Sequence, residues 1–280
     1  MTDIDTLRAD IERLAGDVTP DTMEESRAAV RRLLTALGEG HVRAAEKGPE
    51  GWTAIEWVKT GILLAFRVGR TTEIPGTPAS YFDRDTLPLR ATRGVEENIR
   101  IVPGGSSVRA GAYLAENVVI MPPAFVNVGA YVDQGAMIDS HALVGSCAQV
   151  GCRVHLSAGA QLGGVLEPVG LRPVIVEDDA LVGGNAGVFE GTLVGARAVI
   201  APGVQLTAST TVYDLVTGEI HTGGPERPLS IPEAAVVVPG SRPARGEVAE
   251  RHGLHHYVPL IVKYRDERTD AATALEEALR

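Results

Sequence analysis

Aromatic residues are scarce in this 280-residue chain, where Phe, Trp and Tyr together make up 4%. Hydrophobic residues nevertheless reach 44% and charged residues 22%, which excludes an intrinsically disordered chain. The core must therefore be built mainly from small aliphatic side chains. Cysteine is limited to Cys147 and Cys152, too few to staple a secreted scaffold, so we expect a reducing, cytoplasmic setting.

Excess positive charge and long hydrophobic runs are also lacking. The formal net charge is -10, which argues against nucleic acid or an anionic membrane surface as a partner. The N-terminal stretch is charged throughout, and residues 117–132, one of the longest uncharged stretches, are interrupted by two prolines and a glycine. Because a membrane-spanning helix needs about 20 mostly apolar residues, we expect neither a spanning segment nor a signal peptide.

Residues 1–99 are predicted to form a helical N-terminal domain and a linker. Apolar residues recur with helical spacing in three segments, which predicts helices over 3–15, 21–38 and 53–66. Several prolines mark residues 69–88 as a loop that joins this domain to the next.

A period of six runs through residues 100–217, which are predicted to form a separate domain. The aliphatic positions are Val102, Val108, Leu114, Ile120, Val126, Val132, Ile138, Val144, Val150, Leu156 and Leu162. Four places after each of them stands a second set of mostly small residues, such as Ala112, Ala130 and Ala148, and the last member of this set is Leu166. The register breaks at 167–173 and resumes at Val176. This period is typical of a hexapeptide solenoid, in which aliphatic side chains stack inward about 4.8 Å apart and inserted loops carry function.

Residues 218–280 are predicted to form a small C-terminal cap. The patterns indicate strands over 233–243 and 255–264 and a terminal helix over 271–279. Such a cap protects the open end of a solenoid from edge-to-edge association. The predicted fold class is thus mainly β, a parallel β-helix with a helical N-terminal domain.

Several segments resemble one family of hexapeptide acyltransferases. The segments are AAEKGPEGWTAIEWVKTGILLAFRV (44–68), YFD (81–83), NVGAYVDQGAMID (127–139), VGSCAQVGCRVHLSAGAQLGGVLEP (144–168) and VYDLVTGEI (212–220). Over about residues 20–240 the chain resembles the bacterial tetrahydrodipicolinate N-succinyltransferases. The short sugar and serine acetyltransferases do not share the helical N-terminal domain in this form.

The resemblance implies a left-handed β-helix and a homotrimer with active sites between neighbouring subunits. It also implies transfer of a succinyl group from succinyl-CoA to the amino group of L-2-amino-6-oxopimelate, the ring-opened form of tetrahydrodipicolinate. This reaction belongs to lysine and diaminopimelate biosynthesis. The implied co-substrate, coenzyme A, lies along the coils in this family.

Two residues match functional positions of the family. Arg100 matches the arginine that holds a substrate carboxylate, a task to which the fork of guanidinium donors is suited. Asp139 matches the substrate-contacting aspartate, a proposed general base toward the amine. From the residues alone, a surface arginine and a solvated aspartate remain the alternatives.

The chain also departs from the family pattern. Asp139-Ser140-His141 replaces an Asp-Thr-Trp run, and Asn185 and Gly187 stand where many members have an arginine and a glutamate. We expect Glu190 to substitute as a substrate contact, and His141 to contact the substrate or act as a base. A solvated glutamate and a corner histidine that only packs remain open alternatives.

Ser157, Gly163 and Gly164 are the expected coenzyme A contacts, together with the loop 167–173. Bare glycine backbone allows pantetheine to approach closely, although glycine at a tight corner is the competing explanation. Arg153 or Arg172 would then serve the phosphates.

No metal is expected. Two cysteines fall short of a zinc site, and the hexads hold only His141 and His155 where a carbonic-anhydrase-type site needs three histidines.

Two other functions stay open at this stage. One is an acyltransferase on the same scaffold that uses acetyl-CoA and a related amino acid. The other is a non-catalytic β-helix that serves as a binding module.

Overall fold

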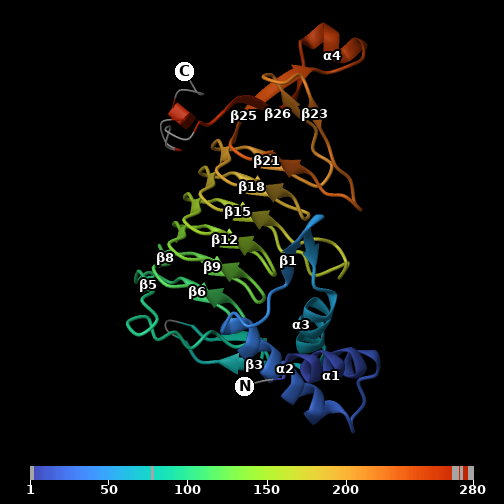
Figure 1. Ribbon diagram of the computed structural model, residues 1–280, viewed down its shortest axis with the longest axis vertical. Coiled ribbons are helices and arrows are strands. Elements are labelled where there is room, and N and C mark those ends of the chain that lie inside the picture. Colours follow the sequence, from blue (N-terminus) through green and yellow to red (C-terminus); the bar gives the residue numbers. More distant parts are fainter. Residues whose placement is uncertain (1–2, 77–78, 267–270, 272–273, 277–280) are drawn as a thin grey trace.

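The computed structural model describes residues 3–76, 79–266, 271 and 274–276 (Figure 1). Most of them form a shaft of short parallel strands, with helices against one end and a long hairpin projecting at the other. The hexads build a parallel β-helix, so the predicted solenoid is confirmed. No described helix is long and apolar enough to cross a membrane.

Each turn of the β-helix contributes one strand to each of three faces, which we name by their first strand. The β5 face consists of β5 (Arg100–Ile101), β8 (Val119–Ile120), β11 (Met137–Ile138), β14 (His155–Leu156), β17 (Leu181–Val182), β20 (Val199–Ile200) and β25 (Ala235–Pro243). The β6 face consists of β6 (Ser107–Val108), β9 (Phe125–Val126), β12 (Leu143–Val144), β15 (Gln161–Leu162), β18 (Gly187–Val188) and β21 (Gln205–Leu206). The β7 face consists of β7 (Tyr113–Leu114), β10 (Tyr131–Val132), β13 (Gln149–Val150), β16 (Ile175–Val176), β19 (Leu193–Val194) and β24 (Ser230–Ile231).

The second residue of the short strands points into the shaft and is buried, as the hexad pattern predicts, except in the first strand, where Ile101 is half-buried. Two positions of the pattern are wrong. Ile101, not Val102, pairs with Ile120, because the first turn carries one more residue between its strands. Leu166 packs with the helical domain instead of the shaft, because it already belongs to the loop that interrupts the hexads.

Most corners of the coil turn through a residue with left-handed backbone, whereas the corner between β8 and β9 contains the cis peptide bond Pro122-Pro123. Along the edge between the β5 and β6 faces, which we call the β5–β6 edge, these residues are His141, Gly159, Asn185 and Gly203. Along the β6–β7 edge, Gly111, Gly129 and Cys147 play this part, and along the β7–β5 edge Gly135, Arg153 and Asp179. Their φ angles lie between 56° and 81°.

Three helices, α1 (Ile4–Gly16), α2 (Met23–Gly38) and α3 (Glu56–Val68), form the N-terminal domain. Their shared core includes Val128 and Cys147 of the β-helix, so the helices sit on the β6–β7 edge. Glycine is required there, since a Cβ on Gly129 would lie 2.8 Å from Cδ1 of Ile62.

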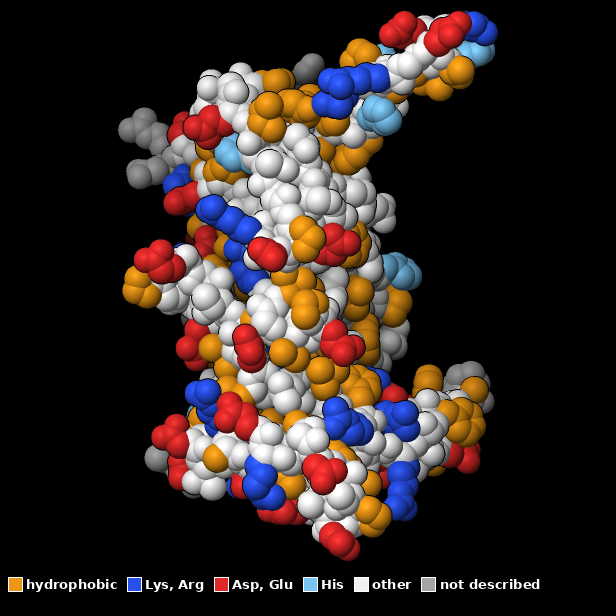
Figure 2. All heavy atoms as spheres, turned by 90° about the vertical axis from the view of Figure 1, so that its right-hand side faces the viewer, with side chains coloured by type: hydrophobic (Ala, Val, Ile, Leu, Met, Phe, Trp, Pro, Cys, Tyr) orange, Lys and Arg blue, Asp and Glu red, His pale blue; other side chains and the backbone are white. Residues whose placement is uncertain are grey.

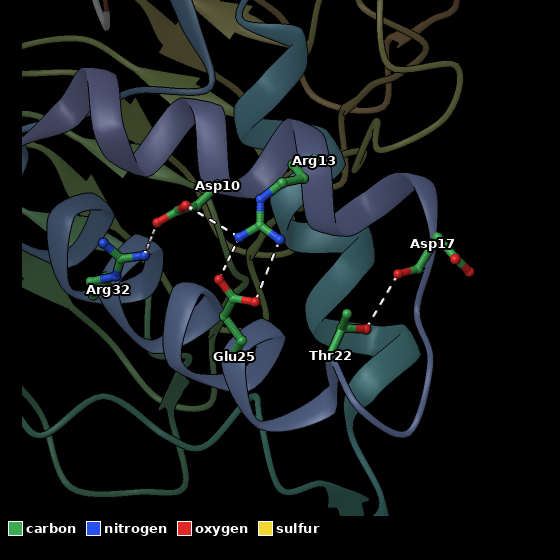
Figure 3. Close-up of polar contacts among 6 residues, drawn as sticks. All are labelled: Asp10, Arg13, Asp17, Thr22, Glu25 and Arg32. Carbon is green, nitrogen blue, oxygen red and sulfur yellow. Dashed lines mark hydrogen bonds and ion pairs between the residues drawn. The ribbon is translucent and has the colours of Figure 1, made fainter.

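Polar contacts between α1 and α2 lie on the outside of this domain (Figure 3). Arg13 pairs with Glu25, and Arg32 Nη2 lies 2.5 Å from Asp10 Oδ2. Exposed ion pairs of this kind contribute about 0–1 kcal/mol each. The helices are therefore held mainly by their buried apolar faces.

Two hairpins lie in the N-terminal region. The first consists of β1 (Ala45–Gly48) and β2 (Gly51–Ala54), so the predicted helix over 53–66 begins only at Glu56. The second consists of β3 (Thr71–Ile74) and β4 (Tyr81–Arg84), within the predicted loop 69–88.

The β1–β2 hairpin and the residues before it cover the β7 face. Lys47 Nζ and Trp52 Nε1 lie 2.6 and 2.9 Å from Glu177 Oε1. The guanidinium of Arg43 lies 3.6 Å from the centre of the Tyr131 ring. This face is therefore occupied by the chain's own N-terminal region.

The C-terminal region leaves the shaft after β21 and returns to it. β22 (Val212–Asp214) pairs with β23 (Ile220–His221), and β24 then continues the β7 face, so the turns of the helix extend past residue 217. β25 pairs with β26 (His255–Tyr264), with α4 (Glu247–His252) at their tip.

The last described residues return to the β5 face. Residues 271 and 274–276 are helical, and the rest of the predicted helix over 271–279 lies outside the described residues. Ala274 packs with Val199 and Val236, so the upper β5 face is covered. Figure 2 shows acidic and basic side chains interspersed over one side of the molecule, without a patch of one sign.

Candidate active site

Asp139 follows strand β11 directly and lies half-buried on the β5–β6 edge. Its Oδ1 accepts a hydrogen bond from the Ser140 amide at 2.7 Å. Its Oδ2 accepts no hydrogen bond from the described residues, and His155 Nε2 lies 4.0 Å from it. One carboxylate oxygen thus has a structural role at the corner, and the other does not.

The same contact, from a side-chain oxygen to the amide of the next residue, recurs at corners on the β7–β5 and β6–β7 edges. Asp133 Oδ1 accepts from the Gln134 amide at 2.8 Å, and Asn127 Oδ1 accepts from the Val128 amide at 2.9 Å. A short polar side chain after the strand therefore has the same structural role at these three successive corners. What distinguishes Asp139 is its position, because its edge lies between the two faces that the N-terminal domain leaves uncovered.

Arg100 is exposed at the start of β5, on the same face as Asp139. It pairs with Val119, which in turn pairs with Met137, two residues before Asp139. Two strand spacings amount to about 10 Å. The structure thus brings Arg100 and Asp139 to one face, on strands two spacings apart.

His141 is the corner residue of its turn, with φ of 62° and an exposed side chain. Its amide donates to Pro123 O at 2.5 Å, and its carbonyl accepts from Gln161 Nε2 at 3.1 Å. Its backbone therefore has a structural role, while the ring faces solvent near Asp139. Asn185 occupies the equivalent corner two turns further along.

Ser157 lies one turn above Asp139 on the β5–β6 edge, since their strands β14 and β11 are paired. Gly163, Gly164 and Glu190 instead follow strands of the β6 face and lie on the β6–β7 edge. The predicted site residues therefore form two groups on different edges of one chain. The first holds Arg100, Asp139, His141 and Ser157, and the second holds Gly163, Gly164 and Glu190.

Close packing of successive turns accounts for the glycines of the second group. A Cβ on Gly163 would lie 2.8 Å from Cδ1 of Phe189, and one on Gly164 would lie 2.8 Å from the Ser146 amide nitrogen. Glu190 is exposed, and its Oε2 accepts from the Ala208 amide at 3.2 Å. Gly187 is also confined, since a Cβ there would lie 2.3 Å from both Phe189 Cε2 and Gln205 Oε1.

The loop that interrupts the hexads leaves the shaft at Gly163 and packs against α3. Lys59 of α3 is fully buried and donates to the carbonyl oxygens of Pro168 and Leu171 at 3.1 and 2.7 Å. Burial lowers the pKa of Lys59. No role could be predicted for this lysine, because in the sequence it looks like one more charged residue of an amphipathic helix.

Arg153 and Arg172, expected near the coenzyme A phosphates, have internal partners. Arg153 binds both carboxylate oxygens of Asp179, each at 2.7 Å. Arg172 donates to the carbonyl oxygens of Gly191 and Pro228. Some of the N–H donors of each guanidinium are therefore already used within the chain and are not available to a phosphate.

Two cavities among the described residues lie away from Asp139. One of about 210 Å³ lies between the β1–β2 hairpin and the β7 face and is lined by Arg43, Trp52, Asp133 and Glu177. Another of about 560 Å³ lies between α2 and residues 85–97. Asp139 instead stands on a convex edge, where a second surface would be needed to enclose a substrate.

The two cysteines are free thiols. Cys147 packs in the core of the helical domain, and burial raises its pKa to about 12. Among the described residues no three His, Cys, Asp or Glu side chains come together in a way that could hold a metal.

His155 was not among the predicted site residues, yet its Nε2 lies 4.0 Å from Asp139 Oδ2. Its side chain points outward from the β5 face, in line with Val119, Met137 and Leu181. The available signal was a histidine at a hexad position where the neighbouring turns carry apolar residues.

Two sequence profiles match the chain. Residues 6–68 match "Tetrahydrodipicolinate N-succinyltransferase N-terminal", and residues 173–208 match "Hexapeptide repeat of succinyl-transferase".

Curated relatives match nearly the whole chain under the name 2,3,4,5-tetrahydropyridine-2,6-dicarboxylate N-succinyltransferase. The proteins from Nitrobacter hamburgensis and Proteus mirabilis are 44% and 42% identical over 270 residues. That from Bradyrhizobium diazoefficiens is 43% identical over 269 residues, and each alignment covers 94% of this chain and 93% of the relative.

A solved structure of a putative 2,3,4,5-tetrahydropyridine-2-carboxylate N-succinyltransferase from Campylobacter jejuni superposes with a TM-score of 0.42. Its sequence is 15% identical, and the match covers 84% of this chain and 62% of that one. The sequence relatives, not this superposition, identify the family.

Proposed function

The chain belongs to the 2,3,4,5-tetrahydropyridine-2,6-dicarboxylate N-succinyltransferase family, and from that membership we propose that it transfers the succinyl group of succinyl-CoA to the amino group of L-2-amino-6-oxopimelate. The amine nitrogen bonds to the thioester carbonyl carbon, the C–S bond breaks, and the amine gives up a proton while coenzyme A leaves as its thiol. The observation that carries the proposal is the similarity of the helical domain and the β-helix alike to enzymes of this name. The product serves diaminopimelate and lysine biosynthesis.

Asp139 is the proposed proton acceptor. An ammonium group must lose a proton before it can attack a thioester, and a carboxylate within hydrogen-bond reach can take it. The Ser140 amide holds Oδ1, so the substrate amine would bind at Oδ2. The local contact thereby orients the group that does the chemistry.

Arg100 is the proposed anchor for a substrate carboxylate. Its guanidinium is exposed and lies on the same face as Asp139. With the amine at Asp139, a bidentate contact at Arg100 would fix the extended dicarboxylate across the lower β5 face. Orienting the amine in this way is a large part of what an enzyme contributes to a two-substrate reaction.

We infer a homotrimer in which neighbouring chains complete one another's sites. The β5–β6 edge carries Arg100, Asp139, His141 and Ser157, while the β6–β7 edge carries Gly163, Gly164 and Glu190. A rotation axis along the shaft sets one edge of a chain against a different edge of the next. Both groups of residues could then face one cleft.

In that cleft Ser157, Gly163 and Gly164 would contact coenzyme A, and His141 and Glu190 would contact the acceptor. Backbone amides of the coils would stabilise the oxyanion. We also propose that the coils wind left-handed, as the family resemblance implies. The two free thiols favour a cytoplasmic location.

The test is thiol release from succinyl-CoA and from acetyl-CoA, with tetrahydrodipicolinate as acceptor and a control without acceptor. We expect acceptor-dependent release with a preference for succinyl-CoA. A preference for acetyl-CoA would favour the first alternative, and no release from either thioester would refute the proposal. The curated relatives favour neither an acetyl donor nor a non-catalytic module.

The same assay tests Asp139. Asp139→Asn is expected to lower kcat at least about a hundredfold with the oligomer intact. Asp133→Asn is the matched control, since Asp133 makes the same corner contact on an edge beside the β1–β2 hairpin. If the two variants turned over equally well, Asp139 would have no part in the chemistry.

A further inference from the structure

The surroundings of His155 make it unusual on the β5 face. Between β8 and β20 the outward residues paired with it along the face are apolar, namely Val119, Met137, Leu181 and Val199. The Nε2 atom of His155 is buried and has no hydrogen-bond partner. A buried polar atom without a partner costs free energy, so its presence requires an explanation.

The contact that explains it is with Asp139. His155 Nε2 lies 4.0 Å from Asp139 Oδ2, the carboxylate oxygen that the Ser140 amide does not hold. A separation below about 3.2 Å would make this a hydrogen bond. In a bound complex such contacts commonly tighten relative to the free enzyme.

Other charged groups near this face are engaged elsewhere or distant. Arg153, at the corner before β14, binds both oxygens of Asp179. Arg100 lies three strands away along the same face, about 14 Å by strand spacing. On the paired strands β11 and β17, the outward neighbours Met137 and Leu181 carry no charge. Asp139 is therefore the charged group that His155 faces.

We propose that His155 is a positioning residue for the acyl transfer, whose Nε2–H donates to Asp139 Oδ2 and aims that oxygen at the substrate amine. The inference rests on the proposed function and deepens it. The Ser140 amide fixes one oxygen only, which leaves the carboxylate plane free to tilt. A second donor on the other oxygen removes that freedom, and catalysis depends steeply on such orientation.

The experiment compares His155→Leu with His155→Gln in the thiol-release assay. Leucine removes the donor, and we expect kcat to fall about tenfold or more while KM for succinyl-CoA changes less than about twofold. Glutamine places an amide N–H near the position of Nε2 and should restore most of the lost kcat. Met137→Leu is the matched control, because it changes the neighbouring side chain of the same face without touching a donor.

Combination with Asp139→Asn separates positioning from general damage. If His155 acts through Asp139, the double variant with His155→Leu is no slower than Asp139→Asn alone. The inference would be overturned if the reduction of kcat in the double variant equalled the product of the two single reductions. It would also be overturned by a folded His155→Leu variant with the kcat of wild type. Should the leucine variant fail to fold, the same comparison is made with His155→Gln and His155→Asn, which differ in where they place the donor, and equal turnover of the two would overturn it.

The failure of the inference differs from that of the proposed function. A wild-type chain that releases no thiol with acceptor present refutes both. An active wild type whose histidine variants are unaffected refutes only the role of His155.

Discussion

The most direct test of how the two domains are joined is Lys59→Met. Methionine keeps most of the aliphatic stem of Lys59 and removes the ammonium group that donates to the Pro168 and Leu171 carbonyls. Lys59 is fully buried, so the change leaves two carbonyl oxygens of the loop without their donor. The variant thus disconnects α3 from the loop that interrupts the hexads.

The expected cost follows from two opposing contributions. Each hydrogen bond from a charged donor is worth about 1.5–3 kcal/mol, so two together are worth about 3–6 kcal/mol. Removing the buried ammonium also removes its desolvation cost, the same cost by which burial lowers the pKa of Lys59, and this offsets part of the loss. Pro168 is exposed, so water can partly replace the lost donor. We expect a net destabilisation of about 2 kcal/mol.

Urea unfolding at fixed protein concentration measures this cost, and limited proteolysis within residues 163–174 reports on the loop. We expect faster cleavage of the loop and a raised KM for succinyl-CoA. Lys47→Met is the control, because the Lys47 side chain is 60% exposed and its ion pair with Glu177 should contribute less than about 1 kcal/mol. Unfolding within about 0.5 kcal/mol of wild type, with unchanged cleavage, would refute the reasoning.

Two further predictions concern stability. Burial alone would raise the pKa of Asp214, but hydrogen bonds from Tyr264 and from the Thr217 and Val216 amides outweigh it and hold that pKa well below its ordinary 3.8. The stabilisation is therefore present above pH 3.8 and is lost as the pH falls below it. In urea unfolding, we expect Asp214→Asn to be about 2 kcal/mol less stable than wild type at pH 7 and the difference to shrink in acid. A difference that stays constant with pH would contradict this. Gly164→Ala should lower the free energy of unfolding by about 1–3 kcal/mol, because the added Cβ would lie 2.8 Å from backbone. The control Gly170→Ala would meet only the end of the Glu56 side chain and should be within about 0.5 kcal/mol of wild type. Equal thermal denaturation of the two variants would show that the turns can separate freely.

The shaft could be predicted from the sequence because its period is a direct consequence of stacking. An inward aliphatic residue every sixth place and a small residue at each corner leave a pattern that needs no distant partner. The pattern failed at Val102 and Leu166, where the turns begin and where the loop leaves them. At both places the chain gains residues, and nothing local marks which residue then points inward.

The hairpins and the site were less accessible to sequence reasoning. The β1–β2 hairpin depends on contacts with Glu177, more than a hundred residues away, and no local pattern contains them. Arg100 and Asp139 came from family resemblance, and the structure adds that they share a face. His155 stands out in the sequence as a histidine at an otherwise apolar hexad position, but its closeness to Asp139 arises only when successive turns are stacked.

The β1–β2 hairpin also bears on how the shaft comes apart. In a solenoid each turn contacts only its neighbours, so turns can be lost one at a time from an open end. Here Lys47 and Trp52 reach Glu177 on the fourth turn of the β7 face, while the helices they extend from sit on Gly111 and Gly129 of the first two. This clamp ties turns that are not adjacent, so we expect the turns up to β16 to unfold together and fraying to start in the turns beyond β16.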